Sequence, residues 1–188
     1  MIHQKDAGVS VAWNIALRMA KGLYVYFVDA DDVITREWLQ FFHKVIEDEG
    51  CDVVRGRFKY WHGDRSLEEL INPNWQILTR YQTPQEVHIC SMSEALENGY
   101  SFQNCIKRDK ILDLKFPIGV RIVEDSIFNA YVMSHVESVI VSDYVGYLYR
   151  INETSATHSS SIGHSRVLDY CFLYIALNDF WGDVNSRK

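Results

Sequence analysis

The sequence predicts an α/β domain with a mixed, mainly parallel sheet covered by helices. Helical and strand-like patterns alternate over the first 60 residues, which is the layout of a parallel core. The stretch 23–28 is short and almost entirely apolar, as in a strand buried on both faces. It ends abruptly in Asp29-Ala-Asp-Asp32. Because active sites of open α/β sheets lie beyond the carboxyl ends of the strands, this turn is the first candidate site.

The first half of the chain carries regular helix signals. Ser10 is expected to cap a helix that stops at Gly22, and Thr35 a second helix that stops at Gly50. A strand is expected to follow at 51–60, where β-prone residues end at a turn.

The second half mixes helices and strands. We expect a loop-rich insertion at 65–82, a short helix at 91–98, a helical turn at 109–112, a helix from Glu124, strands at 139–141 and 144–150, and a last amphipathic helix. The chain therefore divides into one partial α/β domain over residues 1–160 and a C-terminal helix within 161–188. That helix is expected to pack on the domain or on a partner.

Composition and charge exclude several classes of protein. With 47% hydrophobic residues the chain is not disordered, and a net charge of -6 argues against a general nucleic-acid binder. The longest apolar run is only 23–28, whereas a membrane-spanning helix needs about 20 residues. Four cysteines without a Cys-x-x-Cys pair indicate reduced thiols. We expect a cytoplasmic protein that associates at most with the inner face of the membrane.

The acidic turn has two interpretations. Three carboxylates within four residues, Asp29, Asp31 and Asp32, repel one another unless a cation or solvent screens them. A hard divalent ion would use these oxygens and share them with a diphosphate. A solvated acidic turn, in which one Asp caps the local backbone, is the alternative.

Two further segments could carry chemistry. Glu124 and Asp125 precede a helical pattern, and a carboxylate at a helix start stays ionised and can take a proton. Acidic residues are also common in first helical turns without any catalytic role. The stretch from Gly8 to Asn14 opens a helix whose N–H groups could meet a phosphate, as any capped helix could.

Together these segments resemble the family-2 glycosyltransferases, which have the Rossmann-like GT-A fold. The stretches 3–14 and 20–32 follow the family pattern N-x-G-x-S-x-A-R-N, then A-x-G-x-Y-x-x-F-x-D-x-D-D. The segments 104–111 and 115–119 resemble the approach to the family's Glu-Asp motif, which Glu124-Asp125 matches. Tyr147-Leu-Tyr-Arg150 resembles the tail of bacterial polysaccharide members. The resemblance covers residues 2–160, and its strength lies in the order and spacing of four motifs.

The resemblance implies an inverting transfer of a sugar from a nucleoside-diphosphate sugar, UDP-linked, to a hydroxyl acceptor in cell-surface polysaccharide synthesis. Asp31 matches the metal-contacting Asp, with Asp29 and Asp32 nearby, and Mg²⁺ or Mn²⁺ would neutralise the diphosphate. Asp125 matches the general base, and Glu124 would support it or contact the acceptor. Gly8 and Asn14 join Asp29 and Asp31 on the donor side. The implied acceptor is a saccharide or a lipid-linked saccharide.

The sequence departs from the family in two places. Trp13 stands where the family has the Arg of A-R-N, a loss of charge that bears on donor phosphate binding. The family's first strand and its Asp-Asp-Gly-Ser turn have no counterpart, so the sheet is expected to be incomplete at the N-terminus by at least one βαβ unit. An open strand edge favours self-pairing, and we therefore expect a homo-oligomer.

Other functions are compatible with the sequence. A chain that keeps the fold without holding a nucleotide would be a non-catalytic remnant or an interaction module. A metal-dependent phosphohydrolase is less favoured, since such sites gather His with carboxylates and no His is close in sequence to the acidic turn. His158 and His164 are candidates for a late metal ligand, although an exposed loop His is the simpler interpretation of both.

Overall fold

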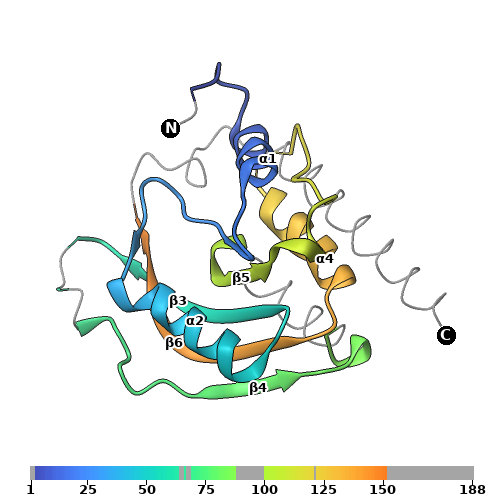
Figure 1. Ribbon diagram of the computed structural model, residues 1–188. Coiled ribbons are helices and arrows are strands. Elements are labelled where there is room, and N and C mark those ends of the chain that lie inside the picture. Colours follow the sequence, from blue (N-terminus) through green and yellow to red (C-terminus); the bar gives the residue numbers. More distant parts are fainter. Residues whose placement is uncertain (1–2, 64–65, 67–68, 88–99, 121, 152–188) are drawn as a thin grey trace.

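The computed structural model describes residues 3–63, 66, 69–87, 100–120 and 122–151. Helices and strands are interspersed along this part of the chain (Figure 1). The elements are α1 (Val9–Met19), β1 (Tyr24–Tyr26), β2 (Val33–Ile34), α2 (Arg36–Glu49), β3 (Val53–Trp61), β4 (Ile77–Tyr81), β5 (Asn104–Lys107), α4 (Glu124–His135), β6 (Val139–Arg150) and the 3-10 helices η2 (Ser101–Gln103) and η3 (Arg108–Lys110).

The described strands form one mixed sheet in the order β1-β5-β3-β6-β2, and β4 also pairs with β6. The α/β class is thus confirmed, but the expectation of a mainly parallel sheet is wrong for these strands. Only β3 and β6 pair in parallel, whereas the four other pairings are antiparallel. The reason is that β5 inserts in the reverse direction between β1 and β3. Strands β1, β3 and β6 nevertheless run the same way, so their carboxyl ends share one edge.

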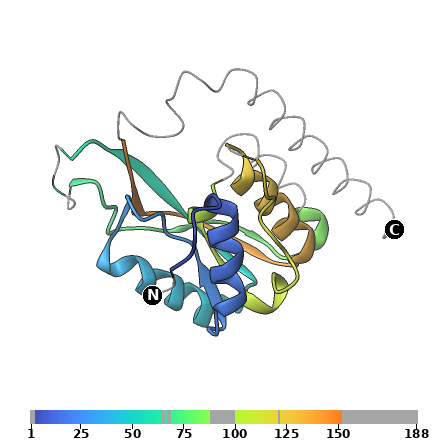
Figure 2. The same ribbon diagram turned by 90° about the horizontal axis from the view of Figure 1, so that it is seen from above.

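Helices cover both faces of the sheet (Figures 1 and 2). One core lies between the sheet and the helices α1 and α4, and it includes Leu17, Val53 and Phe128. The second core lies under α2, where Trp38, Phe42 and Val45 pack on the opposite face. No helix within the described ranges is long and apolar enough to cross a membrane.

Several expected boundaries shift for local reasons. Helix α1 begins one residue before Ser10, because Gly8 takes the N-cap position with a φ of 87°, and Ser10 is buried in the first turn. Helix α2 lies between Thr35 and a left-handed Gly50, as predicted, although the Thr35 side chain makes no capping hydrogen bond. Strand β1 covers only part of the stretch 23–28. Leu23 is 83% exposed, and within the strand only Val25 is buried.

Other elements differ in kind. The expected loop at 65–82 contains β4, and the two strands expected at 139–150 form one continuous strand with register shifts against β3. The helical turn near 109 is η3, and α4 begins at Glu124 as predicted. The helix expected at 91–98 and the C-terminal helix within 161–188 lie outside the described residues. Strand β1 ends the described sheet order, and the expected homo-oligomer stays a prediction.

A tryptophan packed on two glycines fixes α2 to the sheet. Trp38 is fully buried, and its indole lies against Gly56 of β3 and Gly146 of β6. A Cβ at Gly56 would lie 2.2 Å from the indole, and one at Gly146 would lie 2.0 Å from it. Only glycine permits this approach, so the two neighbouring strands leave a slot for one large ring.

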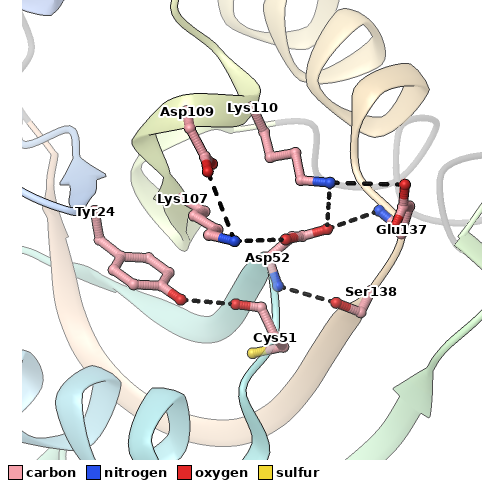
Figure 3. A network of polar contacts seen from close by, with 8 residues as sticks. All are labelled: Tyr24, Cys51, Asp52, Lys107, Asp109, Lys110, Glu137 and Ser138. Atoms are coloured by element: carbon pink, nitrogen blue, oxygen red, sulfur yellow. Dashed lines mark hydrogen bonds and ion pairs between the residues drawn. The ribbon is translucent and has the colours of Figure 1, made fainter.

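At the opposite end from the acidic turn, a polar network joins the starts of β3 and β6 (Figure 3). The buried Asp52 carboxylate accepts the backbone N–H of Glu137 at 2.9 Å and lies 3.3 Å from the Lys110 ammonium and 3.8 Å from that of Lys107. The Asp52 backbone N–H donates to the Ser138 hydroxyl at 3.0 Å. This end of the sheet is thus closed by paired charges.

Replacing Gly146 by alanine should destabilise the protein by about 3 kcal/mol, because the added methyl group would overlap the Trp38 ring. Urea unfolding of Gly146→Ala measures the loss. The double variant Gly146→Ala/Trp38→Leu should lose less than the sum of the two single changes, since the smaller side chain relieves the overlap. An unfolding free energy of Gly146→Ala equal to that of the wild type would show that Trp38 does not occupy this slot.

Candidate active site

The acidic turn follows β1 and is fastened to β6. Its backbone closes through a hydrogen bond from the N–H of Asp32 to the carbonyl of Asp29, at 3.2 Å. The Asp32 carboxylate accepts the hydroxyl of Tyr147 and, at 2.8 Å, the backbone N–H of Arg150. The Tyr147 oxygen in turn accepts the backbone N–H of Asp29 at 3.3 Å. Asp32 therefore anchors the turn, while Asp31 is exposed.

The carboxylates of the turn affect one another. Burial, followed by the charges of Asp32, Asp31 and Glu124, raises the pKa of Asp29 to about 6. Burial also raises the pKa of Asp32, although its bonds from Tyr147 and Arg150 favour the charged form. Negative charge is concentrated here, in a setting where a cation would be stabilised.

The second motif lies within electrostatic reach of the first. Asp125 is in the first turn of α4, and its carboxylate accepts the backbone N–H of Ser126 at 2.8 Å. Burial is the main cause that raises its pKa to about 8, and the charge of Glu124 comes next. The Ser126 bond opposes this shift, and Asp29 adds to it. The expectation that the helix start keeps this carboxylate ionised is therefore wrong, because burial outweighs the helix end and leaves the group mostly protonated at pH 7. Asp125 nevertheless keeps part of its surface accessible.

A buried chain of hydrogen bonds positions α4. Asn129, one turn after Asp125, accepts a bond from the Asn104 amide at 3.2 Å. The Asn104 oxygen accepts the Arg55 guanidinium N–H at 2.7 Å, so α4 is tied to both β5 and β3. Phe128 stacks on Phe116 with ring centroids 3.9 Å apart. These contacts hold the start of α4 in a fixed place beside the carboxyl end of the sheet.

The donor-side candidates of α1 have structural partners. The Asn14 amide donates to the Phe116 carbonyl at 2.9 Å, and its oxygen accepts the Phe116 N–H at 2.8 Å. Trp13, at the family's Arg position, packs its ring on Phe27 and Phe116. Gly8 forms the N-cap, and its N–H donates to Asp6 at 3.1 Å. The donor-binding roles of Gly8 and Asn14 stay predictions.

The oxygen donors of the turn fit a metal that is shared with a ligand rather than enclosed by protein. In the part of the chain that the structure describes, no three His, Cys, Asp or Glu side chains converge on a common point. With Asp32 bound to β6, the exposed Asp31 and the half-buried Asp29 remain as oxygen donors. Mg²⁺ commonly uses one or two carboxylates together with phosphate oxygens and water. His158 and His164 lie outside the described residues.

Sequence reasoning missed the partners that hold the site. Tyr147 and Arg150 belong to the motif that resembles polysaccharide members, but the sequence gives no sign of their contacts with Asp32. These two hydrogen bonds join residues that lie 115 and 118 positions apart in the sequence, so they leave no local pattern. Tyr100 was missed as well, although the charge of Asp125 contributes to the raised pKa of its phenol. The sequence feature that points to these residues is the clustering of aromatic side chains at 58–61 and 147–149.

The chain belongs to glycosyl transferase family 2. Residues 1–104, more than half of the 188, match this family. Among similar proteins, the uncharacterized glycosyltransferase EpsJ of Bacillus subtilis is 27% identical over 84% of this chain, and the glycosyltransferase GlyA of Streptococcus pneumoniae is 30% identical over 82%. The chain spans 46% of the length of EpsJ and 23% of that of GlyA.

The fold agrees with this membership. The structure is similar to that of S. aureus TarS residues 1-349 in complex with UDP-GlcNAc, with a TM-score of 0.63 and 18% identity. The match covers 96% of this chain and 54% of the TarS chain. The expected GT-A-like α/β fold, present in part, is therefore confirmed.

The raised pKa of Asp125 predicts a pH-dependent stability. Between the unfolded pKa of about 4 and the folded pKa of about 8, the folded protein holds more protons than the unfolded chain, so stability falls as pH rises through this window. Asp125→Asn removes this loss. The unfolding free energy of the variant relative to that of the wild type should therefore increase from pH 5 to pH 8.

Asp29→Asn is the matched comparison for this urea-unfolding series. Its gain should level off near pH 6, because burial and neighbouring charge raise the pKa of Asp29 only to about 6. If the difference between Asp125→Asn and wild type were the same at pH 5 and pH 8, the environment assigned to Asp125 would be wrong.

Proposed function

We propose that this chain carries the transfer centre of an inverting, metal-dependent glycosyltransferase. It would move a sugar from a nucleoside-diphosphate sugar to a hydroxyl acceptor in cell-surface polysaccharide synthesis. The observation that carries the proposal is the meeting of two acidic motifs at one sheet edge. Burial is the main cause of both raised pKa values, but the charge of Glu124 contributes to that of Asp29, and the charge of Asp29 contributes to that of Asp125. Membership in glycosyl transferase family 2 supports the reaction class.

The proposed roles follow from burial and charge. Asp31, exposed, and Asp29 would hold Mg²⁺ or Mn²⁺ together with the donor diphosphate. The cation would neutralise charge on the leaving nucleoside diphosphate. Asp32 would hold the turn in position, since its carboxylate is bound to β6.

Asp125 would accept the proton of the acceptor hydroxyl. The hydroxyl oxygen would bond to the anomeric carbon, and the bond from that carbon to the diphosphate would break on the opposite face. Burial, followed by the charge of Glu124, raises the pKa of Asp125 to about 8, so its deprotonated form is a stronger base than an exposed Asp and becomes the major form only above that pH. A UDP-linked donor is supported by the similarity to TarS, which binds UDP-GlcNAc. A saccharide or lipid-linked saccharide is the proposed acceptor, at the cytoplasmic face of the membrane.

The donor side is tested by Asp31→Ala, which should abolish Mn²⁺-dependent binding of UDP in calorimetry because it removes an oxygen ligand. Asp109→Ala is the control, since it removes an exposed carboxylate at the other end of the sheet and should leave UDP binding unchanged. Unchanged UDP binding by Asp31→Ala would refute the metal role. Absence of any UDP binding by the wild type would favour a non-catalytic member of the family.

The acceptor side is tested by Asp125→Asn in a protein that contains this chain and transfers sugar. Turnover should fall by about 10²- to 10⁴-fold with donor affinity nearly intact, because a base acts on the acceptor proton in the transition state. A parallel loss of UDP binding would mean that Asp125 is structural.

A further inference from the structure

Three tyrosines form a partly exposed feature beside the acidic turn, which we call the aromatic wall: Tyr60, which is exposed, and Tyr100 and Tyr149, which are half-buried. Tyr60 of β3 and Tyr149 of β6 are neighbours in the parallel register at the carboxyl ends of their strands, with ring centroids 5.7 Å apart. The residue after Tyr149 is Arg150, whose backbone N–H binds Asp32. The aromatic wall and the acidic turn are therefore joined through one backbone bond.

Buried rings support the aromatic wall from behind. Tyr100 stacks on the buried Phe102 with centroids 4.9 Å apart and an interplanar angle of 12°. Phe58 contacts both Tyr60 and Tyr100 edge to face, each at 5.3 Å. Tyr60 nevertheless remains 54% exposed. A large ring that is held in place yet left open to solvent adds little to a core and suits a binding surface.

Helix α4, which carries Asp125 in its first turn, packs against η2 directly after Tyr100. Burial raises the pKa of the Tyr100 phenol, the Tyr60 side chain adds to the shift, and so does the charge of Asp125. Together with the strand-end position of Tyr60 and Tyr149 and the bond from the Arg150 N–H to Asp32, this contact places the aromatic wall near both the acidic turn and the proposed base.

We infer that the aromatic wall is the acceptor subsite of the transferase proposed above, and that it takes a neutral sugar ring stacked on Tyr60 with a hydroxyl directed to Asp125. A pyranose presents an apolar C–H face that packs on an aromatic ring, while its hydroxyl edge can bond to phenol oxygens. That the bound sugar is an acceptor rests on the proposed function, but the binding of a sugar to this surface can be tested without any transfer.

The charges around the aromatic wall favour a neutral ligand over an anionic one. Two carboxyl groups are linked to the aromatic wall: Asp32 binds the backbone N–H of the residue after Tyr149, and Asp125 acts on Tyr100. A nearby cation, Arg150, lies over the Trp61 ring at 5.1 Å. Lys59 alternates with Tyr60 along β3 and so belongs to the other face of the strand. An anionic polyol phosphate would meet like charge at this surface, which disfavours binding.

This charge pattern separates the chain from one of its relatives. A poly(ribitol-phosphate) beta-glucosyltransferase of Bacillus spizizenii is 26% identical over 78% of this chain. The name of that relative specifies an anionic polymer, whereas the acidic surroundings of the aromatic wall favour an uncharged saccharide here. The two ligand types are thus the two arms of a direct test.

The test is an NMR titration of this chain with neutral trisaccharides of glucose, galactose and N-acetylglucosamine, with ribitol 5-phosphate as the anionic probe. At least one neutral trisaccharide should bind more tightly than ribitol 5-phosphate. Tyr60→Ala should weaken that binding about tenfold, and Tyr60→Phe, which keeps the ring, should stay within about twofold of wild type. Since Tyr60 is largely exposed, both variants should fold, and Mn²⁺-dependent UDP binding should not change.

Equal trisaccharide binding by Tyr60→Ala and wild type, no binding of any neutral trisaccharide, or tighter Tyr60-dependent binding of ribitol 5-phosphate would each overturn the inference. Failure of the proposed function looks different. In that case the wild type would not bind UDP with Mn²⁺, whatever Tyr60→Ala does to the trisaccharides.

Discussion

The bond between the Asp32 carboxylate and β6 is the constraint on which the arrangement of the site depends. Without it, a turn of three acidic residues would be free to extend into solvent, where like charges separate. The Tyr147 hydroxyl and the Arg150 N–H hold one of the three carboxylates, and a hydrogen bond to a charged group contributes about 1.5–3 kcal/mol. The chain then re-enters the sheet at β2, the Thr35 N–H bonds the Gly146 carbonyl at 2.9 Å, and α2 follows. Asp29 is left within electrostatic reach of Glu124 at the start of α4, and Asp31 is exposed.

The two ends of the sheet use charge in opposite ways. At the end where β3 and β6 begin, Asp52 is matched by Lys107 and Lys110, and acid and base compensate each other (Figure 3). At the end where these strands finish, the carboxylates of the turn and of α4 accumulate, and burial raises the pKa of Asp29 and Asp125. Such uncompensated charge is unfavourable for folding, and it is typical of functional sites.

Local patterns predicted the parts of the molecule that depend on neighbouring residues. The boundaries of α2 follow from Thr35 and Gly50, and the start of α4 follows from Glu124. The acidic turn follows from the apolar stretch 23–28, which contains β1. Properties set by distant pairing were not predictable in this way. The reversed strand β5 is one example, and β4 is another, because its pairing with β6 overrides a sequence without clear alternation. The anchoring role of Asp32 belongs to the same class, since its partners come from the far end of the described chain.

The central claim is that the acidic turn and the start of α4 form one centre, and paramagnetic NMR tests it directly. Mn²⁺ added with UDP broadens the signals of amides close to the ion. If the two motifs form one centre, the amide signals of Asp31 and Ser126 should broaden together, while those of Asp52 and Lys110, at the opposite end of the sheet, stay sharp. Broadening at Asp31 with Ser126 unaffected, or broadening centred on Asp52, would contradict the claim.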